Sequence, residues 1–146
     1  MKKIAFVLLI ASITTSFSTA EKRSASKGNI TVTVTGIDEI KGQIVFMLFN
    51  QADGFPKELD KAFKKVYVKE FNDVATATFS EVPFGDYAVS VFHDQNMDGE
   101  IQTNFIGMPK EPVGASNLTK MGKPSYKKCV FMLNEAEIAI KLRFIL

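Results

Sequence analysis

The sequence predicts an all-β fold: a single antiparallel β-sandwich of about seven strands, Ig-like or prealbumin-like, with one short helix near residues 56–64. Hydrophobic and polar residues alternate from Ile30 onward, which is the period of a strand with one buried face. Turn-forming residues separate these short runs, and no stretch has the period of a long helix. A chain of 146 residues with 46% hydrophobic residues suits one domain with one core.

The N-terminus has the three parts of a secretory signal peptide. Lys2 and Lys3 are positively charged, residues 4–13 are apolar, and Ser18 and Ala20 are the small residues that cleavage after Ala20 requires. We therefore expect export to the periplasm or beyond the cell, with an uncleaved N-terminal anchor as the alternative. No later stretch is apolar and long enough to span a bilayer, so we expect no transmembrane segment in the mature chain. These observations divide the chain into a signal peptide (1–20), a flexible leader (21–29) and the sandwich domain (30–146).

The first two predicted strands differ in how they are covered. Residues 30–35 alternate as a half-buried strand does, whereas residues 43–49 (QIVFMLF) are apolar on both faces. The second strand must therefore be central in its sheet or covered on its outer side. Segment 50–63 is a candidate for that cover, because Pro56 suits a first helical turn and Leu59 stands four residues before Phe63.

The remaining predicted strands are short and separated by turn signals. They comprise residues 65–71, 74–80, 86–93, 129–133 and 137–146. Asn72-Asp73 predicts a hairpin turn between the first two of these, and Pro83 with Gly85 predicts the next turn. Residues 94–128 have no sustained periodicity, and a connection of this length inside a compact domain is often functional.

Charge and composition exclude several classes of function. The formal net charge is +2, and removal of Lys2 and Lys3 would leave the basic and acidic residues in balance. The chain has no basic stripe, so we expect no nucleic-acid partner. A single cysteine excludes an internal disulfide framework, and a single histidine excludes most histidine-based clusters. We expect His93 to be structural and Cys129 to be a buried thiol, and therefore no enzyme.

One octet, residues 93–100, contains side chains of the types that bind metal ions. Asp94, Asn96 and Asp98 place oxygen donors at alternate positions before Gly99, which matches the first half of an EF-hand-type calcium loop. The carbonyl of Glu100 would be the seventh-position ligand of that loop. The remaining positions are less complete, with Gln102 at the ninth and Phe105 at the twelfth, where a bidentate carboxylate is expected. The loop therefore predicts a weak calcium site, and the alternative is a plain turn rich in Asp, Asn and Gly.

The chain resembles a family of exported bacterial proteins, DUF2141. The resemblance covers nearly all of residues 30–146 and lies in FNQADGFP and in FSEVPFGDYAVSVFHDQNMDGEIQTNFIGMPKEPVGASN. It implies a small β-sandwich in the periplasm or beyond, with no established activity. The Pro-x-Gly-x-Tyr turn at Pro83, Gly85 and Tyr87 is similar also to Cna-B and carboxypeptidase-regulatory-like modules.

Two functional interpretations follow from the sequence. The first is an exported, monomeric, non-enzymatic β-sandwich module that binds an unknown envelope protein or glycan, structural or adhesive in role. The alternative is a periplasmic or secreted protein that binds a small ligand or carbohydrate through the 94–126 loop. A hydrolase would need a nucleophile–base pair, and His93 has no evident partner in the sequence.

Overall fold

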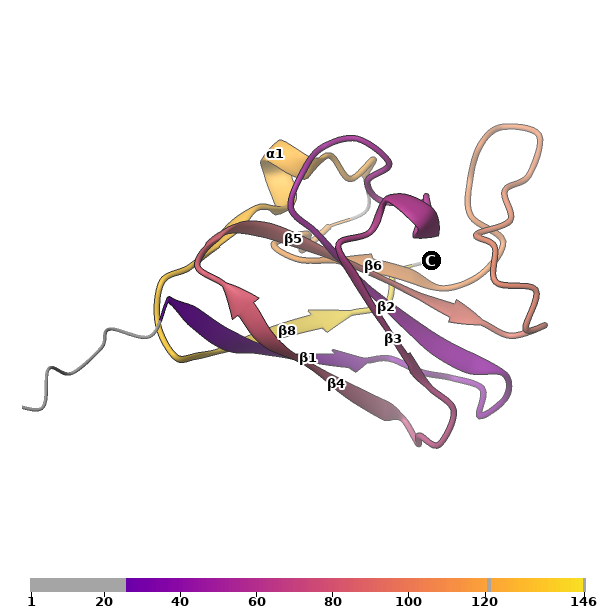
Figure 1. Ribbon diagram of the computed structural model, residues 1–146. Coiled ribbons are helices and arrows are strands. Elements are labelled where there is room, and N and C mark those ends of the chain that lie inside the picture. The colour runs from indigo at the N-terminus through magenta and orange to yellow at the C-terminus, as the bar shows by residue number, and fades with distance from the viewer. Residues whose placement is uncertain (1–25, 121, 146) are drawn as a thin grey trace, which may run out of the picture.

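The computed structural model describes residues 26–120 and 122–145, which form two β-sheets packed face to face (Figure 1). The first sheet has three strands in the order β4-β1-β8. The second has the order β3-β2-β5-β6, with β7 also pairing with β5. The strands are β1 (Lys27–Thr35), β2 (Gln43–Phe49), β3 (Lys64–Val68), β4 (Val74–Pro83), β5 (Gly85–Asp94), β6 (Val113–Ala115), β7 (Phe131–Leu133) and β8 (Glu137–Arg143). The predicted all-β sandwich is confirmed, with eight strands.

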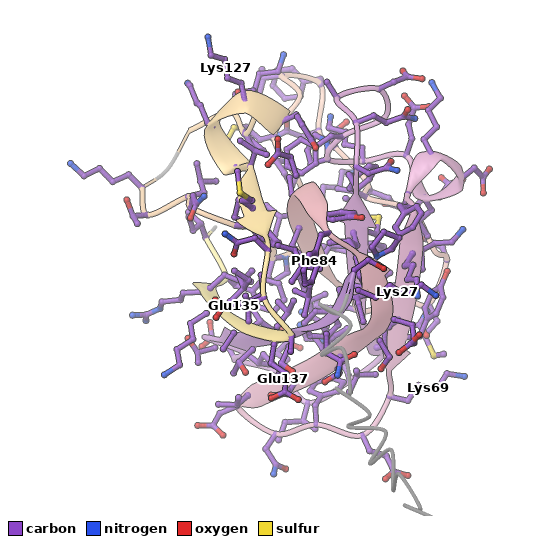
Figure 2. All side chains as sticks on the ribbon, turned by 60° about the vertical axis from the view of Figure 1, so that its left-hand side comes forward. Lys27, Lys69, Phe84, Lys127, Glu135 and Glu137 are labelled. Atoms are coloured by element: carbon purple, nitrogen blue, oxygen red, sulfur yellow. The ribbon has the colours of Figure 1, made fainter. Side chains whose placement is uncertain are left out.

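The main core fills the space between the two sheets. Alternate residues point inward because successive side chains of a strand face opposite ways, as Ile44, Phe46 and Leu48 of β2 do. Figure 2 shows Phe84, from the turn between β4 and β5, among the side chains at one end of this core. The Tyr87 hydroxyl donates a hydrogen bond of 2.9 Å to the Pro83 carbonyl and so ties this turn to β5.

The outer face of the central strands β2 and β5 is also covered. Val45, Met47 and Phe49 of β2 are buried on that face, beneath Phe55 and Leu59 of the segment that follows β2. This confirms the prediction that β2 is central and that segment 50–63 covers it. Figure 1 shows this segment and α1 (Tyr126–Cys129) on the same side of the sheet.

The short helix expected near residues 56–64 is a single 3-10 turn, Leu59–Lys61. Pro56 does not begin it, because Pro56 belongs to the turn that precedes the helical residues. The helical turn ends at once because Ala62 is extended and the N–H of Phe63 donates to the Leu48 carbonyl at 2.8 Å. The chain is thus drawn back to the sheet before a second turn can form.

One predicted connection and one predicted strand direction are wrong. Asn72-Asp73 does not join a hairpin, because β3 pairs with β2 while β4 pairs with β1, so the chain crosses between sheets here. The sandwich is also not purely antiparallel, since β1 and β8 pair in parallel. Both errors have one cause: alternating hydrophobic residues define a buried face but not the identity or direction of the neighbouring strand.

Two boundaries also differ from the predictions. Lys27–Asn29 belong to β1 and not to a flexible leader, because the Asn29 N–H donates to the Ala136 carbonyl at 2.8 Å. Cys129 ends α1 instead of opening a strand, and β7 begins only at Phe131. The predicted burial of Cys129 is confirmed.

The predicted signal peptide, residues 1–20, and the leader up to residue 25 lie outside the described residues. Within residues 26–120 and 122–145, no helix has the length and apolar character needed to cross a membrane.

Candidate functional site

The long connection between β5 and β6 forms a projecting loop at one end of the covered sheet (Figure 1, orange). Its two arms run together: the His93 N–H donates to the Pro112 carbonyl at 2.9 Å, and the Lys110 N–H donates to the Gln102 carbonyl at 2.8 Å. We call residues 94–102 and 110–112 the base of the loop and residues 103–109 its tip. The stretch 94–128, which has no sustained periodicity in the sequence, thus contains β6 and most of α1 among its described residues.

Asp94 organises the base from a fully buried position at the end of β5. One carboxylate oxygen accepts the N–H of Asp98 at 3.1 Å, and the other accepts the N–H of Gly99 at 3.0 Å and the side-chain amide of Gln43 at 2.9 Å. Gly42 permits this packing, because a Cβ there would lie 2.1 Å from the Asp94 carbonyl oxygen. Asp94 thus fixes the turn that holds the other predicted ligands.

Asp98 lies at the exposed side of the same turn and gathers the polar groups around it. Its carboxylate accepts hydrogen bonds from the Asn96 amide at 2.7 Å, the Glu100 N–H at 2.9 Å and the Gln102 amide. These bonds, led by that from Glu100, lower the pKa of Asp98. The loop thus brings Asp94, Asn96, Asp98 and Gln102 together. Among the described residues Glu100 joins this network through its main chain, and its side chain is exposed.

Sequence reasoning missed Glu111 as a member of this site. Its Oε1 accepts the Gln95 N–H at 2.9 Å, although the residue belongs to the returning arm of the loop. Its Oε2 is buried and has no hydrogen-bond partner among the described residues. Burial and the nearby negative charges of Asp94 and Asp98 raise the pKa of Glu111. The family-like stretch TNFIGMPKE ends at this glutamate, and that was the available signal.

The base also borders a polar pocket of about 450 Å³. Segment 57–60 lines one side, and residues 98–101 line the other. Glu58 is paired with Lys61 at 3.1 Å, so part of the acidic lining is neutralised. In the described part of the chain, no group of three or more His, Cys, Asp or Glu side chains is arranged to hold a metal ion.

The tip is a tight turn that presents apolar side chains to solvent. Asn104 holds it, because its Oδ1 accepts the N–H groups of Ile106 at 3.1 Å and Met108 at 2.9 Å. A bridge between Thr103 and Pro109 closes the turn. Phe105 is 100% exposed and Ile106 is 69% exposed. Phe105 and Ile106 therefore do not pack the loop onto the sheet, because the turn directs them into solvent.

The single histidine and the single cysteine are both buried, His93 between the sheets and Cys129 on the outer side of the five-stranded sheet. His93 donates from Nε2 to the Lys41 carbonyl at 2.7 Å and stacks on Phe144. Cys129 lies beneath α1, where burial raises the pKa of its thiol. The thiol therefore holds its proton more strongly than an exposed cysteine does.

The fold and site define a small two-sheet β-protein with one elaborated loop at a sheet end. The chain belongs to a family described as an uncharacterized protein conserved in bacteria (DUF2141), whose model matches residues 32–141. No curated protein and no solved structure matches the chain. The similarity to Cna-B and carboxypeptidase-regulatory-like modules stays a prediction.

Proposed function

We propose that this protein is an exported, non-enzymatic β-sandwich module that binds a protein of the cell envelope through the tip of its long loop. The observation that carries the proposal is the full exposure of Phe105 on a turn fixed by Asn104. An ordered turn that presents an aromatic side chain loses little conformational entropy on binding, which favours use as an interface anchor.

The chemistry of the tip favours an apolar pocket on a partner protein over a glycan. The side-chain carbonyl of Asn104 accepts two hydrogen bonds within its own turn, so the tip offers few free polar groups for sugar hydroxyls. Phe105, Ile106 and Met108 instead form a small apolar surface. Such a surface contributes binding free energy when it is removed from water.

A non-enzymatic role is supported by the position of the two residues best suited to catalysis. His93 is buried in the core and hydrogen-bonded to the Lys41 carbonyl. Cys129 is also buried, and the pKa of its thiol is raised. Neither group is available to a substrate in the native sandwich.

Export is tested by mass spectrometry of the protein purified from its native cell. Glu21 at the N-terminus is expected, because Ser18 and Ala20 satisfy the small-residue requirement of signal cleavage. Recovery of chains that retain Met1 in the membrane fraction would instead support the uncleaved anchor.

Tip binding is tested by site-specific photo-crosslinking in cells, with the reactive group at position 105 or at position 40. Ile40 is a matched control, because it is 69% exposed, as is Ile106, but lies in the β1–β2 connection. We expect a discrete crosslinked envelope protein from position 105, its loss with Ile106→Ser, and its retention with Ile40→Ser. Equal crosslinking from both positions would contradict the proposal.

Two further measurements separate the alternatives. Binding of the purified protein to a glycan array would favour the carbohydrate-binding interpretation of the 94–126 loop. Flotation with phospholipid vesicles that contain no protein would assign the tip to the membrane surface instead. The proposal predicts neither result.

A further inference from the structure

We propose that the base of the loop is a calcium site in which Glu111 supplies the carboxylate that the twelfth position of the loop lacks. The other oxygen ligands are Asp94, Asn96, Asp98 and the carbonyl of Glu100. Glu111 is brought to these residues by the return of the loop, since its Oε1 accepts the N–H of Gln95, between the first two ligands.

The unpartnered oxygen of Glu111 is the observation that points to a ligand. A buried carboxylate oxygen without a partner is costly, and buried charges are normally paired or bound to a metal. Glu111 is only 7% exposed, and Asp94 is buried close to it. Within the described residues the salt bridges lie elsewhere, so no Lys or Arg offsets this negative charge. A bound cation would offset the negative charge of the Glu111 carboxylate.

The amide groups around Asp98 show how the ligands would close on the ion. The side chains of Asn96 and Gln102 both direct NH₂ donors at Oδ2 of Asp98. These donors supply positive partial charge beside the carboxylate, as a cation would. Rotation of each amide by half a turn presents its oxygen in place of its nitrogen. For Asn96 this rotation gives up the hydrogen bond that its Oδ1 accepts from the Asp98 N–H at 3.2 Å. No group of three or more His, Cys, Asp or Glu side chains among the described residues is arranged to hold a metal ion as it stands, so calcium binding requires the carboxylates as well as the amides to move toward the ion.

The donor set selects calcium among biological cations. All the donors are carboxylate, amide or main-chain oxygens, which hard cations prefer. They come from two arms of a loop and number six when Gln102 is included, which suits the flexible coordination of calcium. Magnesium demands a tighter octahedron and gives up its waters reluctantly.

The test measures thermal unfolding of the purified protein in calcium, in magnesium and in chelator. In about 10 mM calcium the melting temperature is expected to rise by a few degrees, because an ion that binds only the folded state stabilises it. Glu111→Gln should lose this rise, yet unfold in chelator at the same temperature or higher, because it keeps an oxygen for Gln95 and removes a buried charge. Glu100→Gln is the matched control and should keep the rise, since Glu100 contributes only its carbonyl.

A flat melting temperature in wild-type protein across the three conditions would overturn the proposal. A calcium response that survives in Glu111→Gln would show that Glu111 is not a ligand. If Glu111→Gln fails to fold, the exposed Asp98→Asn should still lose the response, and the carbon-13 shift of the Glu111 carboxylate in wild-type protein should move on addition of calcium. An unmoved shift would count against the site. These measurements use the isolated protein and do not depend on the tip binding a partner.

Discussion

The outer faces of the two sheets are built differently. On the three-stranded sheet the outer face carries threonines that pair across strands, with Thr31 and Thr78 hydroxyls 3.1 Å apart and Thr33 and Thr76 hydroxyls 3.2 Å apart. On the five-stranded sheet the outer face of β2 is buried: Val45, Met47 and Phe49 are apolar, and Gln43 at the start of the strand donates to the Asp94 carboxylate. The three-stranded sheet therefore has a single buried face, whereas the central strands β2 and β5 of the other sheet are buried on both faces.

The difference explains where the elaborate connections lie. Segment 50–63, the base of the long loop and α1 all pack on the outer side of the five-stranded sheet, through Phe55, Ile101 and Tyr126. Because this sheet needs a cover, its connections are ordered, and an ordered loop can hold ligands and present a tip. The three-stranded sheet needs no cover, and no comparable loop lies on its outer face within residues 26–120 and 122–145.

The largest effect is expected from Phe49→Ala, on the covered face of β2. Phe49 is fully buried and meets Phe55 edge to face at a centroid distance of 5.3 Å. Its truncation should lower the free energy of unfolding by about 3–5 kcal/mol, through lost burial and the cavity left behind. Urea denaturation measures this change. Thr33→Ala on the other sheet is the control, and a cost equal to that of Phe49→Ala would break the comparison.

An intermediate effect on the free energy of unfolding is expected from Ser116→Ala, which removes the hydroxyl that links α1 to the covered sheet. The Ser116 hydroxyl donates to the Cys129 carbonyl at 2.6 Å and accepts the Val89 N–H at 2.9 Å. The substitution removes the Ser116 acceptor of the Val89 N–H and leaves the Cys129 carbonyl with a long, 3.5 Å bond from the Asn117 side-chain amide, so the free energy of unfolding should fall by about 1–3 kcal/mol.

The same substitution has a second, local readout. The Cys129 thiol of the wild-type protein should react slowly with a thiol reagent in native buffer, because it is buried and its pKa is raised. Ser116→Ala should speed this reaction, whereas the exposed Ser80→Ala should leave it unchanged. Rapid labelling of the wild-type thiol would contradict the burial of Cys129.

The smallest effect on the free energy of unfolding is expected from the pair Thr33 and Thr76, on the outer face of the three-stranded sheet. The two residues lie directly opposite each other on β1 and β4. A double-mutant cycle with alanine at both positions should give a coupling of roughly 0.2–1 kcal/mol, the range for cross-strand pairs. A coupling well above that range would mean that the hydrogen bonds between paired threonine hydroxyls are a main source of stability for this sheet.

The sequence patterns that predicted the fold correctly are those that depend on a single strand. The run QIVFMLF has no polar face, so it predicts burial on both sides wherever the strand lies, and β2 is buried on both sides. Alternation likewise predicted the inward faces of β1 and β4. The predicted relations between strands were wrong at Asn72-Asp73 and for the parallel pair β1 and β8, because parallel and antiparallel neighbours accept the same alternation.

The candidate site was predicted in the same partial way. Asp94, Asn96 and Asp98 are close in sequence, so their spacing alone predicted that they converge in one turn. Glu111 joins them only because the loop returns along itself, and no local spacing encodes that return. The exposure of Phe105 is not evident from the sequence for a related reason: apolar character favours burial unless a turn such as that at Asn104 directs the side chain outward.

The parallel pairing of β1 with β8 also sets an order of assembly. β1 is made first and β8 last, yet they are neighbours through the whole register from Asn29↔Glu137 to Thr35↔Arg143. A chain that emerges N-terminus first from a ribosome therefore leaves one edge of β1 unpaired until residues 137–143 are free. The three-stranded sheet is completed only after all the strands of the five-stranded sheet have emerged.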